Sequence, residues 1–216
     1  MKLRLVFFLI AIPLLFGGCK KLLINPAKRI ACIGTSITDG YVLPVEQTYP
    51  YQLQLLTNSP DKVLNYGVGG CTVLKKGDRP YWQAEKYQFA LQWKPTTVII
   101  EFGTNDSKKQ NWQYKDEFKS DYLALINSFR KLSSSPKIYI CIPTPAFREN
   151  FEIQPDVVKN EIVPLVYEIA RENNLPIIDF NKLMLDHSEL FPDGIHPNAE
   201  GAALLAKEVH KVISAN

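Results

Sequence analysis

Three residues from two distant parts of the chain have the types and the surroundings that acyl transfer requires. Ser36 follows the apolar run 30–33, at the point where a buried strand would end in a tight loop. His196 lies near the other end of the chain in a loop held by two prolines, and Asp193 precedes it by three residues. A serine nucleophile needs a base to take its proton and a carboxylate to orient that base. Ser36, His196 and Asp193 are therefore candidates for a catalytic triad.

The same residues also have structural interpretations that the local sequence leaves open. Gly-Thr-Ser is common in turns, and Ser36 could cap the helix that follows. Asp193 could begin a turn, and His196 could be a packed loop histidine. The other two histidines are weaker candidates for a base, because His187 precedes the last motif and His210 lies on a helix face that we expect to be solvated.

Three groups could donate hydrogen bonds to the oxyanion that forms when a serine attacks an ester. The Ser36 amide lies at the strand-to-helix turn, and Gly70 lets the backbone approach an oxygen because it has no Cβ. Asn105, in a Gly-Thr-Asn-Asp segment, offers a side-chain amide, although it could instead close an Asx turn. Removing one such donor typically costs about 10²–10³ in turnover.

Apolar runs and helical patterns alternate along the chain and predict the elements that position these residues. Most of the runs are continuous, as in parallel strands that are buried on both faces. The predicted strands are Arg29–Ile33, Val63–Tyr66, Thr97–Phe102, Ile138–Ile142 and Ile177–Phe180. The predicted helices cover about 50–57, 82–93, 116–132, 156–173 and 199–213, and Pro164 should kink the fourth. The alternation predicts a three-layer α/β sandwich around a parallel sheet.

Glycine, proline and polar residues follow each predicted strand. These clusters contain Ser36, Gly70, Asn105 and, after a short insertion, the segment with Asp193 and His196. Because the carboxyl ends of parallel strands share one edge of the sheet, the clusters should meet there. The convergence favours a catalytic interpretation of Ser36 over helix capping.

As a set, these motifs resemble those of the SGNH hydrolases, also called GDSL esterases. The motifs occur in the family's order and spacing from about Lys28 to the end of the chain, and they are Gly34-Thr35-Ser36-Ile37-Thr38, Gly70, Gly103-Thr104-Asn105-Asp106 and Asp193-Gly194-Ile195-His196. The resemblance implies a flavodoxin-like α/β/α sandwich with a five-stranded parallel sheet. It also implies a serine esterase that needs no metal or cofactor.

The resemblance assigns a role to each site residue. Ser36 would be the nucleophile, His196 the base and Asp193 the third member of the triad, while Ser36, Gly70 and Asn105 would form the oxyanion hole. One departure is Thr35, because the family usually has an aspartate before the serine. The packing of the loop around Ser36 is therefore in question, and a catalytically silent glycan-binding lipoprotein is one alternative.

Within the family, the first motif is similar to that of bacterial carbohydrate O-acetylesterases, including sialate and xylan esterases. The expected substrate is then a small-molecule or glycan ester, and Trp82, Trp112 and Tyr114 could stack on its sugar ring. Each of these aromatic side chains could equally pack at a helix start or on the surface. A lysophospholipase or thioesterase of the same superfamily is a second alternative, and a cysteine hydrolase that uses Cys71 is a third.

The amino-terminal sequence is typical of an exported lipoprotein. A basic start and an apolar stretch lead to small residues before Cys19, which resembles the lipobox of bacterial lipoproteins. We therefore expect a signal peptide over 1–18, a lipid anchor on Cys19, a tether over 19–27 and the hydrolase domain over 28–216. The protein would be held on a membrane of the bacterial cell envelope, in the periplasm or at the cell surface. Phe16 departs from the lipobox pattern, so plain signal cleavage or an uncleaved anchor stays open.

Composition and charge indicate one globular domain without affinity for nucleic acid. The chain has 216 residues, of which 46% are hydrophobic and 22% charged. Its formal charge of +3 falls to about +1 without Lys2 and Arg4, which gives no electrostatic reason to expect nucleic acid as a partner. Three cysteines follow Cys19, and we expect no structural disulfide and no zinc site among them. The sequence leaves the oligomeric state open.

Overall fold

Five parallel strands form one sheet in the order β2-β1-β3-β4-β5, within the residues that the computed structural model describes, 27–57 and 60–215. The strands are β1 (Arg29–Gly34), β2 (Lys62–Asn65), β3 (Thr97–Glu101), β4 (Lys137–Ile142) and β5 (Ile177–Asp179). Ile30 of β1 pairs with Val63 of β2 on one side and with Thr97 of β3 on the other. This order is that of flavodoxin-like folds, so the predicted fold is confirmed. The strand ends differ from the prediction by at most one residue.

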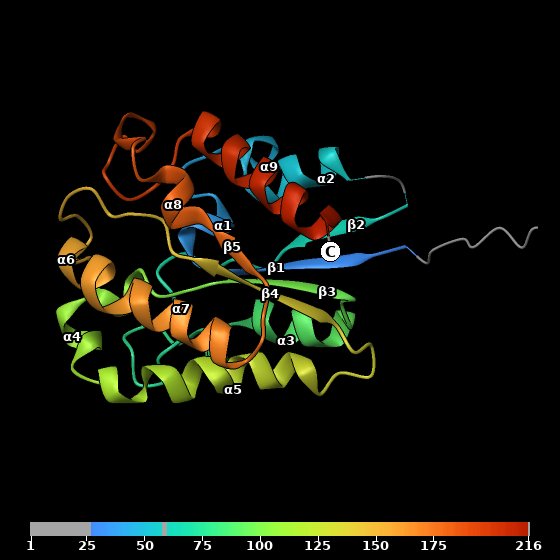
Figure 1. The fold of residues 1–216 in the computed structure, drawn as a ribbon, viewed down its shortest axis with the longest axis horizontal. Coiled ribbons are helices and arrows are strands. Elements are labelled where there is room, and N and C mark those ends of the chain that lie inside the picture. The colour runs from blue at the N-terminus through green and yellow to red at the C-terminus, as the bar shows by residue number, and fades with distance from the viewer. Residues whose placement is uncertain (1–26, 58–59, 216) are drawn as a thin grey trace, which may run out of the picture.

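Helices cover both faces of the sheet (Figure 1). One face carries α3 (Glu85–Trp93), α5 (Phe118–Arg130) and α7 (Val163–Glu172), and the other carries α2 (Tyr49–Leu56), α8 (Phe180–Met184) and α9 (Ala199–Ala215). Because neither face meets water, the central strands need apolar residues at most positions. This is why their sequences are continuous apolar runs.

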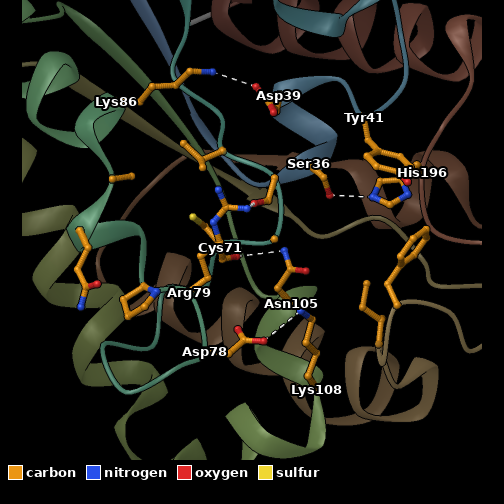
Figure 2. A pocket seen from close by; sticks show the side chains of 18 of the residues that line it. Ser36, Asp39, Tyr41, Cys71, Asp78, Arg79, Lys86, Asn105, Lys108 and His196 are labelled. Atoms are coloured by element: carbon orange, nitrogen blue, oxygen red, sulfur yellow. Dashed lines mark hydrogen bonds and ion pairs between the residues drawn. The ribbon is translucent and has the colours of Figure 1, made fainter.

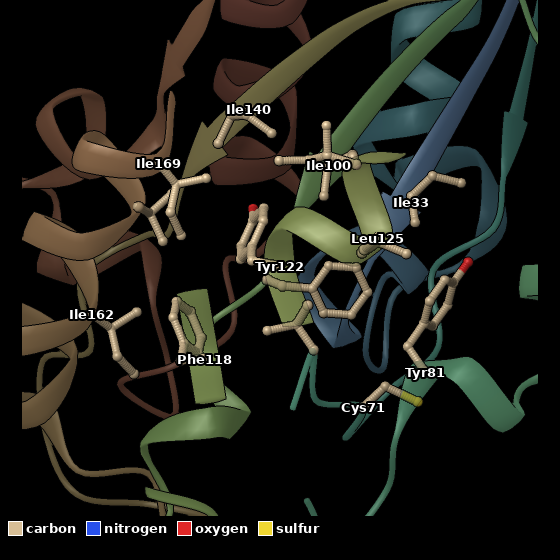
Figure 3. Close-up of a cluster of buried hydrophobic side chains, with 14 of the residues drawn as sticks. Ile33, Cys71, Tyr81, Ile100, Phe118, Tyr122, Leu125, Ile140, Ile162 and Ile169 are labelled. Atoms are coloured by element: carbon tan, nitrogen blue, oxygen red, sulfur yellow. The ribbon is translucent and has the colours of Figure 1, made fainter. Parts of the chain in front are cut away.

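Successive residues of each central strand pack into opposite cores. Ala31 and Ile33 of β1 belong to the core under α3, α5 and α7, whereas Ile30 and Cys32 belong to the core under α2 and α9. Figure 3 shows the first core, where side chains of α5 and α7 meet Ile33 and other isoleucines of the sheet. Burial of one such side chain stabilises the fold by roughly 1.5–3 kcal/mol. The two cores hold the sheet in place, so the loops at its carboxyl edge are not needed for packing and can form a site.

Short and irregular helices are the main features that periodicity did not predict. They include α1 (Ser36–Asp39), α4 (Lys109–Trp112) and α6 (Pro155–Val157), together with 3-10 helices at 45–47, 81–83, 105–107, 115–117 and 188–190. Each is shorter than the window over which a helical period can be recognised. Pro164 acts as expected: the predicted helix over 156–173 is divided, with a π-helical turn at Val158–Ile162 just before α7.

Cys32, Cys71 and Cys141 are free and buried. The predicted signal peptide, Cys19 and most of the predicted tether lie outside the described residues. Over 27–57 and 60–215, no helix combines the length and the apolar character that a membrane span needs.

Candidate active site

The loop after β1 presents Ser36 at the carboxyl edge of the sheet. Thr35 occupies the N-cap position of α1, and Ser36 is the first residue of the helix. Ser36 is therefore not the capping residue, which removes the structural alternative for it. Gly34 is required for this turn, because a Cβ at that position would lie 2.1 Å from Thr38 Oγ1 and 2.9 Å from the Glu101 carbonyl oxygen.

Ser36, His196 and Asp193 form a continuous chain of hydrogen bonds. His196 Nε2 lies 2.8 Å from Ser36 Oγ, and His196 Nδ1 lies 2.7 Å from Asp193 Oδ2 (Figure 2 shows the first contact). The serine and histidine are only 8% and 7% exposed. An ionised carboxylate can only accept, so Nδ1 carries the ring proton and Nε2 is free to accept from Ser36. The structure thus brings together all three residues of the predicted triad in the order that acyl transfer requires.

The Asp193 carboxylate also shapes the loop that carries His196. Its Oδ1 accepts hydrogen bonds from the backbone N–H groups of Ile195 (2.8 Å) and His196 (2.7 Å). Burial alone would raise the pKa of Asp193, but the hydrogen bonds from His196 and Ile195 lower it below its ordinary value. The carboxyl group is therefore ionised at neutral pH and can stabilise an imidazolium.

Two side chains that the sequence did not single out hold the same loop from outside. Arg148 donates from Nε to the Asp193 carbonyl oxygen (3.0 Å) and from Nη2 to that of Pro192 (2.8 Å), and Asn150 Nδ2 also donates to Asp193 O (3.0 Å). Gly194 (φ +83°) makes room for Arg148, since a Cβ there would lie 2.3 Å from Arg148 Cγ. No local pattern could reveal this contact, because more than 40 residues separate the partners.

Gly70 and Asn105 line the same cavity as Ser36. Gly70 adopts φ +76°, a conformation that favours glycine, and its N–H forms no hydrogen bond within the described residues. Asn105 is 4% exposed, and its Nδ2 donates to the Cys71 carbonyl oxygen at 3.1 Å, which leaves its second N–H available. The next residue, Asp106, ties the two loops together by accepting from the N–H groups of Leu74 (2.9 Å) and Val73 (3.3 Å).

The cavity at Ser36 has a volume of about 860 Å³, the size of a small-molecule site. Figure 2 shows a wall of charged side chains opposite Tyr41 and His196. In this wall, Lys86 Nζ lies 2.9 Å from Asp39 Oδ1, Lys108 Nζ lies 3.2 Å from Asp78 Oδ2, and Arg79 Nη1 donates to the Gly69 carbonyl oxygen (2.6 Å). A substrate that fills this cavity therefore meets many polar groups.

The three aromatic residues that were candidates for stacking on a sugar do not line this cavity, as their alternative interpretation of packing predicted. Trp82 donates its indole N–H to the Val73 carbonyl oxygen (2.8 Å) and packs against the core. Trp112 is buried and donates to Glu161 Oε2 (3.0 Å), and Tyr114 is partly buried against the same core. Their proximity in sequence to the site loops did not determine where their rings point, and the structure instead places Tyr41 and Phe151 in the cavity.

A buried glutamate explains how Thr35 is accommodated. Glu101, the last residue of β3, is fully buried, and its Oε2 accepts from the Thr35 N–H (3.2 Å), Thr35 Oγ1 (3.0 Å) and Thr38 Oγ1 (3.2 Å). The backbone and the hydroxyl group of Thr35 are thus both held by a carboxyl group of the neighbouring strand. Burial raises the pKa of Glu101 to about 7, against the lowering effect of these hydrogen bonds.

Glu101→Gln should change how stability depends on pH. In the unfolded chain Glu101 loses its proton near pH 4.5, whereas in the folded protein it keeps the proton up to about pH 7. The wild-type free energy of unfolding should therefore fall, relative to that of the variant, as the pH rises through this window, by on the order of 2 kcal/mol. Urea unfolding of both proteins at pH 5 and pH 8 measures the difference. Parallel pH profiles would contradict the assignment, and Glu46→Gln, at an exposed position, is the control.

Comparison with known proteins places this site in a family. Residues 32–204 match the GDSL-like Lipase/Acylhydrolase family. The chain is 39% identical over 207 residues to an acetylxylan esterase of Xylanibacter ruminicola, a match that covers 87% of this chain and 43% of the relative. The chain thus spans less than half the length of that curated relative.

Solved structures share the fold at lower identity. A carbohydrate acetylesterase from Sinorhizobium meliloti has a TM-score of 0.74 at 17% identity, over 87% of this chain and 99% of that one. A two-domain esterase active on acetylated mannans has a TM-score of 0.65 at 24% identity, over 88% of this chain and 50% of that one. The chain belongs to the GDSL-like lipase/acylhydrolase family, a family of carboxylic ester hydrolases, as its motifs predicted.

Proposed function

We propose that the protein is a serine esterase that removes acetyl groups from carbohydrates through an acyl-enzyme. The observation that carries the proposal is the hydrogen-bonded chain from Ser36 through His196 to Asp193, which opens into a cavity that Gly70 and Asn105 also line. The acetylxylan esterase among the relatives and the mannan-active esterase among the structural neighbours support a carbohydrate substrate.

In the first step, Ser36 Oγ attacks the ester carbonyl carbon while its proton moves to His196 Nε2. The carbonyl π electrons move to the oxygen, and the resulting oxyanion accepts hydrogen bonds from the N–H groups of Ser36 and Gly70 and from Asn105 Nδ2. Asp193 stabilises the imidazolium. When the tetrahedral intermediate collapses, the bond to the sugar oxygen breaks, and His196 returns the proton to that oxygen.

In the second step, His196 takes a proton from a water molecule, whose oxygen attacks the acyl carbon of the ester on Ser36. The same donors hold the second oxyanion, and its collapse breaks the bond to Ser36 Oγ and releases acetic acid, which ionises to acetate in solution. The proton on His196 returns to Ser36 Oγ, so the enzyme regains its initial state. In both steps His196 transfers the protons, the oxyanion donors stabilise the negative charge on the oxygen, and Asp193 stabilises the imidazolium.

Cys71 is a poor candidate for the nucleophile although it lines the cavity. Its side chain is almost fully buried, and burial raises its pKa to about 11 despite the lowering effect of Arg79. The thiolate, which is the reactive form, is then scarce at neutral pH. The geometry supports Ser36 instead.

Acyl-chain preference on 4-nitrophenyl esters tests the proposal against a lipid substrate. A lipid enzyme would bury the acyl chain in an apolar groove and gain about 0.8 kcal/mol for each CH₂. In this cavity a long chain would instead desolvate charged residues such as Lys86 and Asp39. We expect kcat/KM to be highest for the acetate, lower for the butyrate and lowest for the octanoate.

A preference for octanoate would assign the protein to the lysophospholipases or thioesterases. No turnover of any ester, combined with binding of glycans, would support the catalytically silent alternative. Release of acetate from acetylated xylan, measured on the same preparations, tests the carbohydrate part of the proposal directly.

A further inference from the structure

Two exposed aromatic rings flank the imidazole of His196. The Tyr41 ring lies with its centroid 4.3 Å from that of His196, at an interplanar angle of 32°, and the Phe151 ring lies 5.2 Å away at 71°. The two aromatic rings are 5.6 Å apart, and each side chain is 42% exposed. Both residues line the cavity at Ser36. The histidine therefore lies beside an apolar surface that remains open to the cavity.

Two tight turns present these rings to the cavity. Phe151 and its neighbour Glu152 have φ values of +51° and +63°, and Val42, next to Tyr41, has φ +55°. Phe151 and Glu152 are the central residues of a turn in which the Ile153 N–H donates to the Asn150 carbonyl oxygen (2.9 Å). Val42 lies in a turn that the Leu43 N–H closes by donating to the Gly40 carbonyl oxygen (3.0 Å). The segment with Phe151 is held by Asn150, whose Nδ2 donates to Asp193 O. The two turns thus hold exposed aromatic rings at the cavity beside the base, where a ligand can pack on them.

The chemistry of the reaction determines which part of the substrate meets these rings. His196 must return its proton to the oxygen of the leaving alcohol, so this alcohol lies against the imidazole. The acyl carbonyl oxygen lies instead near Gly70 and Asn105. The group next to Tyr41 and Phe151 is therefore the alcohol, which is the sugar in the proposed reaction.

A sugar ring fits the two kinds of surface in this cavity. One face of a pyranose presents C–H groups, which pack on aromatic rings, and its hydroxyl groups need hydrogen-bond partners. Figure 2 shows Tyr41 beside His196, with Arg79, Asp78 and Lys86 on the opposite wall. The aromatic side can hold the apolar face of the sugar, and polar groups of the cavity can bind the hydroxyl groups that point away from the rings.

We propose that Tyr41 and Phe151 form the binding site for the sugar ring of the leaving alcohol. This inference rests on the proposed function and adds the residues that recognise the substrate class. The competing explanation is that the two rings only hold His196 in place. The two explanations differ because loss of a sugar site affects sugar esters selectively, whereas a displaced His196 affects every ester equally.

The test compares two esters in wild type, Tyr41→Leu and Phe151→Leu. Acetate release is followed in a pH-stat from acetylated xylooligosaccharides and from ethyl acetate, which has no ring. The ratio of kcat/KM for the sugar ester to that for ethyl acetate should fall about 3- to 10-fold in each variant, mainly through KM. The control Phe89→Leu removes an exposed ring that does not line the cavity and should leave the ratio unchanged. An unchanged ratio in both cavity variants would overturn the inference.

A binding measurement separates failure of this inference from failure of the proposed esterase. Unacetylated xylooligosaccharides are titrated by calorimetry into Ser36→Ala, with and without Tyr41→Leu or Phe151→Leu. Weaker binding in the double variants supports the sugar site. If wild type released acetate from neither ester, that result would refute the esterase but not the sugar site. Equal binding in all of these proteins would overturn the sugar site.

Discussion

Ser36→Ala should reduce kcat for 4-nitrophenyl acetate by roughly 10⁵–10⁶-fold, because no acyl-enzyme can form without the hydroxyl group. Residual turnover would come from the oxyanion donors and from substrate binding, which the substitution leaves in place. The hydrogen bond to His196 is the one side-chain contact of Ser36 Oγ among the described residues. The free energy of unfolding should therefore change by less than about 0.5–1 kcal/mol.

Steady-state kinetics and urea unfolding of the same preparations measure both effects. Ser188→Ala, at an exposed position outside the cavity, is the matched control and should retain wild-type turnover. Adding His196→Ala to Ser36→Ala should reduce turnover little further, because residues that act as a unit are not additive. Turnover within tenfold of wild type in Ser36→Ala would show that another group attacks the ester.

The fold could be predicted because its signals are local and repeated. Five continuous apolar runs separated by helical patterns have few solutions other than a parallel sheet covered on both faces. Each strand end was predicted to within one residue, since glycine or polar residues mark the boundary. The short helices at 36–39, 109–112 and 180–184 were missed because they are set by the neighbouring loops rather than by a hydrophobic period.

The site could be predicted only where several motifs converge on the edge of the sheet. Ser36, Gly70, Asn105 and His196 each follow a strand or lie in a rigid loop, so the topology itself brings them together. The proposed stacking residues do not follow a strand in this way. Trp82 and Trp112 lie near the site loops in sequence, but Trp82 packs against the core and Trp112 donates to Glu161. Side-chain direction depends on packing that the sequence does not display.

The role of Glu101 could have been inferred from its position, because an ionisable residue is unusual within a strand that is predicted to be buried. It is an ionisable residue within the predicted strand Thr97–Phe102, and a carboxyl group that is buried in this way needs hydrogen-bond donors. Its partners, Thr35 and Thr38, lie more than 60 residues away in the turn that carries Ser36. Thr35 at this position and the glutamate at the end of β3 are therefore explained together, because the threonine hydroxyl groups supply the donors that the buried carboxyl group needs.

Asp193→Asn should lower kcat by about 10⁴-fold while it preserves the loop. Asparagine keeps an oxygen at the Oδ1 position, which can still accept from the N–H groups of Ile195 and His196. At the Oδ2 position it places an N–H donor 2.7 Å from His196 Nδ1, if the geometry is retained. Nδ1 must then accept, so the ring proton moves to Nε2, which can no longer take the proton of Ser36.

Comparison of Asp193→Asn with Asp193→Ala separates the two roles of this carboxylate. Alanine also leaves two backbone N–H groups without their acceptor, so it should lower the free energy of unfolding by about 1–3 kcal/mol, whereas asparagine should not. Asp186→Asn, on the exposed surface nearby, is the control for both measurements. If Asp193→Asn retained more than a tenth of wild-type kcat, orientation of His196 would not depend on this carboxylate. The contacts of Arg148 and Asn150 with the loop backbone would then suffice to position the base.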